Sequence, residues 1–105
     1  MNFTVENAAK VLRGEKTMTC RRTCKYKVGR TYAVCPGRGK KAVGRIEVLD
    51  IRYFKRAIGA VFRKHLAEME GFPSIAAWQR EYVRLCGAGS LEEPCYRIEF
   101  RFVEN

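Results

Sequence analysis

Apolar and polar positions alternate along four stretches of the chain, and each alternation predicts a β-strand. The clearest is Cys95–Phe102, where every second residue from Tyr96 onward is aromatic or aliphatic and the residues between are charged. Within Val43–Ile51 the apolar positions change phase between Val48 and Leu49, which predicts a β-bulge or a bend in a curved sheet. The other two predicted strands are Lys16–Arg22 and Thr31–Cys35.

Between the third and fourth strands the apolar period lengthens to that of a helix. One face collects Phe54, Ile58, Val61, Phe62 and Leu66, which predicts a helix over Lys55–Met69. Gly71-Phe72-Pro73 interrupts this pattern, and Ser74 is expected to cap a second helix over Ser74–Leu85. A short helix is also predicted at Asn7–Arg13, where Gly14 ends it.

The order of these elements indicates an α+β fold, with a small curved sheet or barrel and two or three packed helices. A length of 105 residues fits a single domain covering 1–105. No apolar run is long enough for a membrane span, and the first ten residues do not resemble a signal peptide. We therefore expect a cytoplasmic protein without a membrane partner, and a monomer.

Positive charge is concentrated in one part of the chain. The net charge is +10, and the segment Lys10–Arg45 holds twelve basic residues and a single acid, Glu15. This segregation favours a polyanionic partner, RNA above all, over a surface that is charged only for solubility. The basic residues expected to contact phosphates are Arg21, Arg22, Lys25, Lys27, Arg38, Lys40 and Lys41.

The five cysteines show no metal-binding spacing. Cys20 and Cys24 are separated by three residues, and the one histidine, His65, is distant in sequence. We therefore expect free, mostly buried thiols, no metal site and no cofactor. The few Asn and Gln residues are typical of thermophiles, in which one disulfide would be compatible with the composition.

The first predicted strand carries the pattern G-x-K-x-x-T-x-R at Gly14, Lys16, Thr19 and Arg21. Strict alternation places Thr19 and Arg21 on one strand face, and the turn at Gly14 can redirect Lys16 toward them. Such a set can bind an anion or supply a threonine nucleophile activated by lysine, although a plain polar strand face has the same spacing. We expect neither Lys16 nor Thr19 to be part of the core.

Two carboxylates, Glu68 and Glu70, stand at the end of the predicted helix over Lys55–Met69. The helix dipole disfavours negative charge there, so this placement requires a compensating cation unless water solvates it.

Together these patterns resemble the ASCH (activating-signal-cointegrator homology) domains of the PUA-like superfamily. The resemblance includes the G-x-K-x-x-T-x-R pattern, the Val28–Tyr32 segment, Glu70–Ser74 before an aromatic helix, and the closing strand. It implies a small PUA-like β-barrel with helices across it and a cleft between them. It also implies RNA binding or RNA-linked metabolism.

One branch of the family is a minimal amidohydrolase that removes the acetyl group from acetylcytidine, and ribonuclease activity has also been linked to the family. In the amidohydrolase branch the catalytic residues correspond to Lys16, Thr19 and Glu70, with Glu68 as an alternative to Glu70. Two hypotheses therefore stand: an RNA-binding module with a Lys/Thr/Arg-lined cleft, or a hydrolase acting on acetylcytidine, free or in RNA. The expected partner is RNA or a nucleoside-type ligand.

Overall fold

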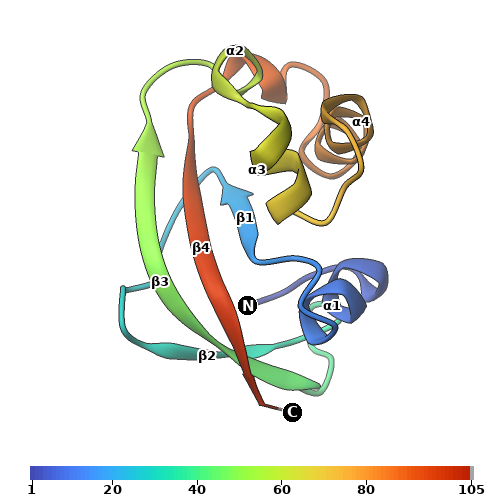
Figure 1. Cartoon of the computed structure of the whole chain (residues 1–105), viewed down its shortest axis with the longest axis vertical. Coiled ribbons are helices and arrows are strands. Elements are labelled where there is room, and N and C mark those ends of the chain that lie inside the picture. Colours follow the sequence, from blue (N-terminus) through green and yellow to red (C-terminus); the bar gives the residue numbers. More distant parts are fainter. Residues whose placement is uncertain (105) are drawn as a thin grey trace.

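The structure, a computed structural model, describes residues 1–104. Helix α1 precedes three strands, three helices follow, and a 3₁₀ turn leads into the last strand (Figure 1). The elements are α1 (Val5–Leu12), β1 (Met18–Arg21), β2 (Thr31–Val34), β3 (Gly44–Phe54), α2 (Ile58–Val61), α3 (Lys64–Met69), α4 (Ile75–Cys86), η1 (Ser90–Glu92) and β4 (Cys95–Glu104).

The four strands form one antiparallel sheet in the order β1-β4-β3-β2. The two longest strands, β3 and β4, pair at the centre of the sheet, and their pairing register shifts between Val48 and Asp50. This shift confirms the predicted bulge, which helps the sheet to curl into a half-barrel. The α+β class and the small barrel-like sheet with packed helices are likewise confirmed.

The N-terminal segment lies beside the end of β2. Asn2 forms a parallel bridge with Cys35, and the Phe3 N–H donates to the Cys35 carbonyl at 2.9 Å. From β1, at the other edge of the sheet, the Arg21 guanidinium donates to the Asn2 carbonyl at 2.7 Å. Arg21 therefore links the two edges of the curled sheet through the N-terminal segment.

Two apolar clusters stabilise the fold, one on each face of the sheet. Helices α2, α3 and α4 gather at one end and cover a cluster that includes Met18, Cys20 and Trp78 (Figure 1). Helix α1 packs on the second cluster, which includes Val11 and Phe100. Strand β1 lies between the two groups of helices.

The single helix predicted over Lys55–Met69 is wrong. Strand β3 continues to Phe54, and the helical part is divided into α2 and α3. Phe62 and Arg63 have extended backbone at the division, with ψ of 143° and 161°. The Phe62 ring stacks on Trp78, so the residue at which the helix is divided packs against α4.

The other predicted elements are confirmed, with ends that differ by a few residues. The Ser74 hydroxyl accepts a hydrogen bond from the Ala77 N–H at 3.1 Å and caps α4, and Gly87 follows its last residue. Among residues 1–104, no helix is long and apolar enough to cross a bilayer.

Candidate functional site

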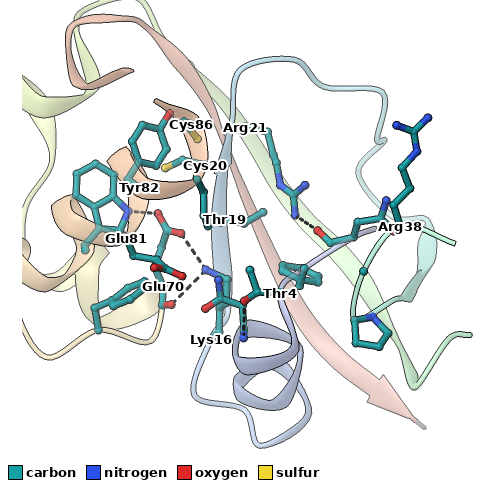
Figure 2. Close-up of a pocket in the computed structure, with 18 residues that line it drawn as sticks. Thr4, Lys16, Thr19, Cys20, Arg21, Arg38, Glu70, Glu81, Tyr82 and Cys86 are labelled. Carbon is teal, nitrogen blue, oxygen red and sulfur yellow. Dashed lines mark hydrogen bonds and ion pairs between the residues drawn. The ribbon is translucent and has the colours of Figure 1, made fainter. Parts of the chain in front are cut away.

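A pocket of about 460 Å³ opens beside β1, between α1, α4 and the loop that follows β2 (Figure 2). Its volume is within the range of small-molecule sites. Charged or polar side chains in its lining come from these parts of the chain, from the N-terminal segment, from the turn before β1 and from the end of α3: Asn2, Thr4, Asn7, Lys16, Thr19, Arg21, Arg38, Glu70 and Glu81. This cavity is called the main pocket below.

Three side chains form a hydrogen-bonded cluster in the main pocket. The Lys16 ammonium lies 2.9 Å from Glu70 Oε1 and 3.2 Å from the Glu70 carbonyl oxygen. The Trp78 indole N–H donates to the other carboxylate oxygen, Oε2, at 2.7 Å (Figure 2). The Lys16 and Glu70 side chains are only 3% and 6% exposed, so this is a buried ion pair.

The turn after α1 directs Lys16 into the main pocket. Gly14 has φ of +75°, and the N–H groups of Glu15 and Lys16 both donate to the Lys10 carbonyl. Strand β1 begins only at Met18, so the alternation of side chains between the two faces of the strand does not fix the direction of Lys16. Lys16 and Thr19 line the same pocket, and the recorded contacts of the Lys16 ammonium are with Glu70.

Glu70 is placed by the end of α3. It is the C-cap residue of that helix, and Gly71, with φ of +87°, reverses the chain immediately afterwards. A carboxylate at a helix C-terminus is electrostatically unfavourable, and Lys16 supplies the compensating cation. Glu68, the alternative to Glu70 in the sequence, is exposed and does not line the main pocket, so Glu70 is the one of these two carboxylates that does.

Lys16 and Thr19 are both buried, which corrects the expectation that neither belongs to the interior. Lys16 remains buried because Glu70 compensates its charge. Thr19 lies in β1 between the core residues Met18 and Cys20, and it lines the main pocket. The pocket therefore contains Lys16, Thr19 and Glu70 together, as the resemblance implied.

An aromatic stack forms one wall of the site. The Trp78 ring lies parallel to the Phe62 ring, with 3.5 Å between their centroids. It also stacks with the Tyr82 ring, with 4.9 Å between their centroids. Trp78 is 1% exposed, as expected for a core residue, but its bond to Glu70 was not predicted. One chemical argument could have predicted this hydrogen bond from the sequence: a buried indole N–H requires a hydrogen-bond acceptor.

Comparisons with protein-family models and with curated proteins find no match. Solved structures do match. An ASCH domain from Lactobacillus crispatus superposes with a TM-score of 0.73 and 21% identity, covering 95% of this chain and 72% of that one. The chain has the fold of an ASCH domain. The sequence-based expectation of this fold is confirmed.

Two further structures have the ASCH-type arrangement over nearly the whole chain. A protein from Enterococcus faecalis has a TM-score of 0.77 at 16% identity, covering 96% of this chain and 71% of that one. An ASCH protein from Zymomonas mobilis has a TM-score of 0.65 at 16% identity and covers 96% of this chain. This chain spans 64% of the length of the Zymomonas protein.

Two of the residues predicted to contact RNA, Arg21 and Arg38, line the main pocket of this ASCH fold. The Arg21 guanidinium lies 5.1 Å from the Phe3 ring and reaches toward the loop that carries Arg38 (Figure 2). Arg38 is exposed and lines the same pocket. The pocket therefore has two guanidinium groups in its lining besides the buried Lys16.

The other five residues predicted to contact RNA lie outside the lining of the main pocket. Arg22 and Lys25 line a neighbouring hollow, and Arg22 forms an ion pair with Glu93. The remaining three are exposed at the surface: Lys27, Lys40 and Lys41.

All five cysteines are free, and two of them, Cys20 and Cys86, line the main pocket. A hydrogen bond with Cys95, together with burial, raises the pKa of the Cys20 thiol well above its ordinary value. Burial likewise raises the pKa values of Cys86 and of the Tyr82 hydroxyl. These groups are therefore protonated at neutral pH and supply no anionic nucleophile. Within residues 1–104, no group of three metal-ligating side chains occurs.

Proposed function

We propose that this chain binds single-stranded RNA and takes one unpaired nucleoside into the main pocket. The observation that carries this proposal is the Lys16–Glu70 pair, hydrogen-bonded to Trp78, inside a pocket of about 460 Å³. Ligand pockets of this size use a few fixed polar groups to orient what they bind. A net charge of +10 supplies the attraction for a polyanion.

The side chains of the main pocket suit an unpaired nucleoside. Sequence-specific RNA recognition uses hydrogen bonds to base edges, together with aromatic rings or arginine planes against base faces. Here the hydroxyl of Thr19 and the ammonium of Lys16 supply polar groups, and Arg21 supplies a guanidinium plane. The Glu70 carboxylate fixes the Lys16 ammonium, so binding does not require this side chain to be ordered first.

The experiment compares two arginine variants that change the net charge equally. Arg21→Gln removes a guanidinium from the main pocket, whereas Arg52→Gln removes one that lies outside its lining on β3. We expect Arg21→Gln to weaken binding of a short labelled single-stranded RNA by at least fivefold in fluorescence anisotropy, and Arg52→Gln to weaken it by much less. Equal losses would mean that only the overall charge matters and that the pocket is not the binding site.

A second candidate is supported by the presence of Lys16, Thr19 and Glu70 in one pocket. In an acetylcytidine amidohydrolase, the nucleophile would be the Thr19 hydroxyl or a water molecule. It would add to the acetyl carbonyl as Glu70 takes its proton, and the Lys16 ammonium would protonate the departing amine. The 2.9 Å contact would then return the proton from Glu70 to Lys16. If Thr19 were acylated, water would hydrolyse the ester and release acetate.

In the structure the Lys16 ammonium contacts the Glu70 carboxylate at 2.9 Å and the Glu70 carbonyl oxygen at 3.2 Å, so it is engaged by Glu70 rather than placed as a base on the Thr19 hydroxyl. For this reason we rank RNA binding above catalysis. Incubation with acetylcytidine and with acetylated RNA separates the two functions by acetate release. Turnover that is lost in Thr19→Val would establish a threonine nucleophile, and turnover that survives it would assign the attack to water. No turnover by the parent protein leaves the binding function alone.

A further inference from the structure

A second hollow of about 560 Å³ adjoins the main pocket. The two cavities share four lining residues, among them Arg21 at the end of β1 and Leu85 near the end of α4. Beyond the shared wall, the second hollow is lined by the segment that follows β1, which includes Arg22, Lys25 and Tyr26.

A third hollow of about 260 Å³ lies beyond the second. It shares Lys25 and Tyr26 with the second hollow, and its lining also includes Tyr32 of β2. The three cavities are thus contiguous. Residues 21–26 form one wall of the second hollow, which meets the main pocket at Arg21 and the third hollow at Lys25 and Tyr26, and the third hollow also shares Asn2 with the main pocket.

The residues of this wall are basic and aromatic. Arg21, Arg22 and Lys25 lie within five positions, and within residues 1–103 the carboxylate paired with them is that of Glu93, which contacts Arg22. The Tyr26 ring meets Tyr32 edge to face, with centroids 4.9 Å apart and an interplanar angle of 84°.

The Tyr32 hydroxyl accepts a hydrogen bond from the Lys27 N–H at 2.8 Å, which fixes the second ring of this pair. Tyr26 is partly exposed, and the Lys25 ammonium lies 5.9 Å from its ring centroid. Aromatic rings beside cations are the usual arrangement for binding a single nucleic-acid strand.

We propose that an RNA strand whose nucleoside occupies the main pocket continues along residues 21–26, with phosphates at Arg22 and Lys25 and the next base on Tyr26. This inference rests on the proposed function, because the main pocket anchors the strand. It assigns the ligand class as an oligonucleotide rather than a free nucleoside. It also assigns an aromatic stacking site to a residue outside the main pocket.

The other basic segment, Pro36–Lys41, is less suited to carry the strand. Its sequence, P-G-R-G-K-K, contains no aromatic residue on which a base could stack. Lys40 and Lys41 are exposed and line none of the three hollows. This segment therefore supplies the charge-matched control.

The experiment measures affinity against RNA length, from a mononucleotide to a tetranucleotide, by competition with a labelled strand. We expect affinity to rise with length in the parent and in Lys40→Ala/Lys41→Ala, and the rise to be largely lost in Arg22→Ala/Lys25→Ala. Loss of two phosphate contacts lowers the magnitude of the slope of log K against log salt by about 1.4 for a single strand. Tyr26→Leu is expected to cost about 5- to 150-fold for the tetranucleotide, and Tyr26→Phe much less.

Removing the competing carboxylate gives a test by gain of affinity. Glu93→Gln frees Arg22 and is expected to tighten tetranucleotide binding more than Glu6→Gln, which makes the same charge change on the exposed face of α1. Equal effects of these two variants would contradict a phosphate contact at Arg22.

The possible failures are distinguishable. If the mononucleotide binds and Arg21→Gln weakens it, but longer strands bind no tighter, the path along residues 21–26 is overturned and the proposed function survives. If the length dependence is lost in Lys40→Ala/Lys41→Ala instead, the strand takes the other route. If neither mononucleotide nor tetranucleotide binds, both proposals fall. Competition by polyglutamate as strong as that by RNA would overturn the assignment of an oligonucleotide.

Discussion

Replacing Lys16 by methionine tests the buried ion pair on which the main pocket is built. Methionine keeps most of the length of the lysine side chain and removes its charge. The Glu70 carboxylate, whose side chain is 6% exposed, then retains the Trp78 N–H as a partner but loses its counter-ion. Breaking a buried pair by removing one partner costs about 3–5 kcal/mol, because an uncompensated charge stays in the interior.

The assay is urea denaturation followed by tryptophan fluorescence, with the melting temperature as a second measure. A loss of 3 kcal/mol corresponds to a decrease of at least about 12 °C for a domain of this size. The double variant Lys16→Met/Glu70→Gln removes both charges and keeps an oxygen acceptor for Trp78. It should therefore be more stable than Lys16→Met alone. Lys40→Met makes the same chemical change at an exposed position and should alter stability by less than about 0.5 kcal/mol.

Two results would refute this reasoning. One is a cost for Lys16→Met no larger than that for Lys40→Met, which would mean that the ammonium is not paired in the interior. The other is additivity within about 0.5 kcal/mol of the Lys16→Met and Glu70→Gln effects in the double variant, since groups in direct contact are expected to be coupled.

Three further predictions follow from packing, backbone geometry and thiol ionisation. Phe62→Ala removes the ring stacked on Trp78 and should lower the free energy of unfolding by about 3–5 kcal/mol in urea denaturation. Gly71→Ala should lower it by at least about 1 kcal/mol, because φ is +87° and the added methyl group would meet the stem of a lysine in α1 at 3.0 Å; unchanged stability would contradict this geometry. The folded state raises the pKa of the Cys20 thiol above its ordinary 9.0, chiefly through Cys95, so its contribution to stability is present below pH 9 and is lost as pH rises above it. Urea denaturation at pH 7 and pH 10 should show a smaller alkaline loss in Cys20→Ala than in the parent.

Local patterns in the sequence predicted much of the fold. The alternation in Cys95–Phe102 identified β4, and the change of phase after Val48 identified the bulge in β3, because both follow from the two-residue period of a strand. The division at Phe62 and Arg63 could not be predicted in this way. No glycine or proline marks it, and the extended backbone there accompanies the contact of Phe62 with Trp78, which is distant in sequence.

The candidate site was predictable in composition but not in its bonding. Lys16, Thr19 and Glu70 were predicted to line one cleft, and they do. The direct Lys16–Glu70 contact and the bond from Trp78 depend on how the end of α3 lies against the turn after α1. The burial of Lys16 and Thr19 has the same origin, since it requires tertiary packing that a strand pattern does not contain.

The sole tryptophan of the chain permits one direct test of RNA binding in the main pocket. The Trp78 indole N–H donates to Glu70, so its resonance in a ¹H–¹⁵N spectrum reports on the buried cluster. On titration with a short single-stranded RNA, we expect this resonance to shift and to saturate at the same RNA concentration as the backbone resonances of residues 21–26. An indole resonance that stays fixed while the RNA binds elsewhere on the surface would contradict nucleoside binding in the main pocket.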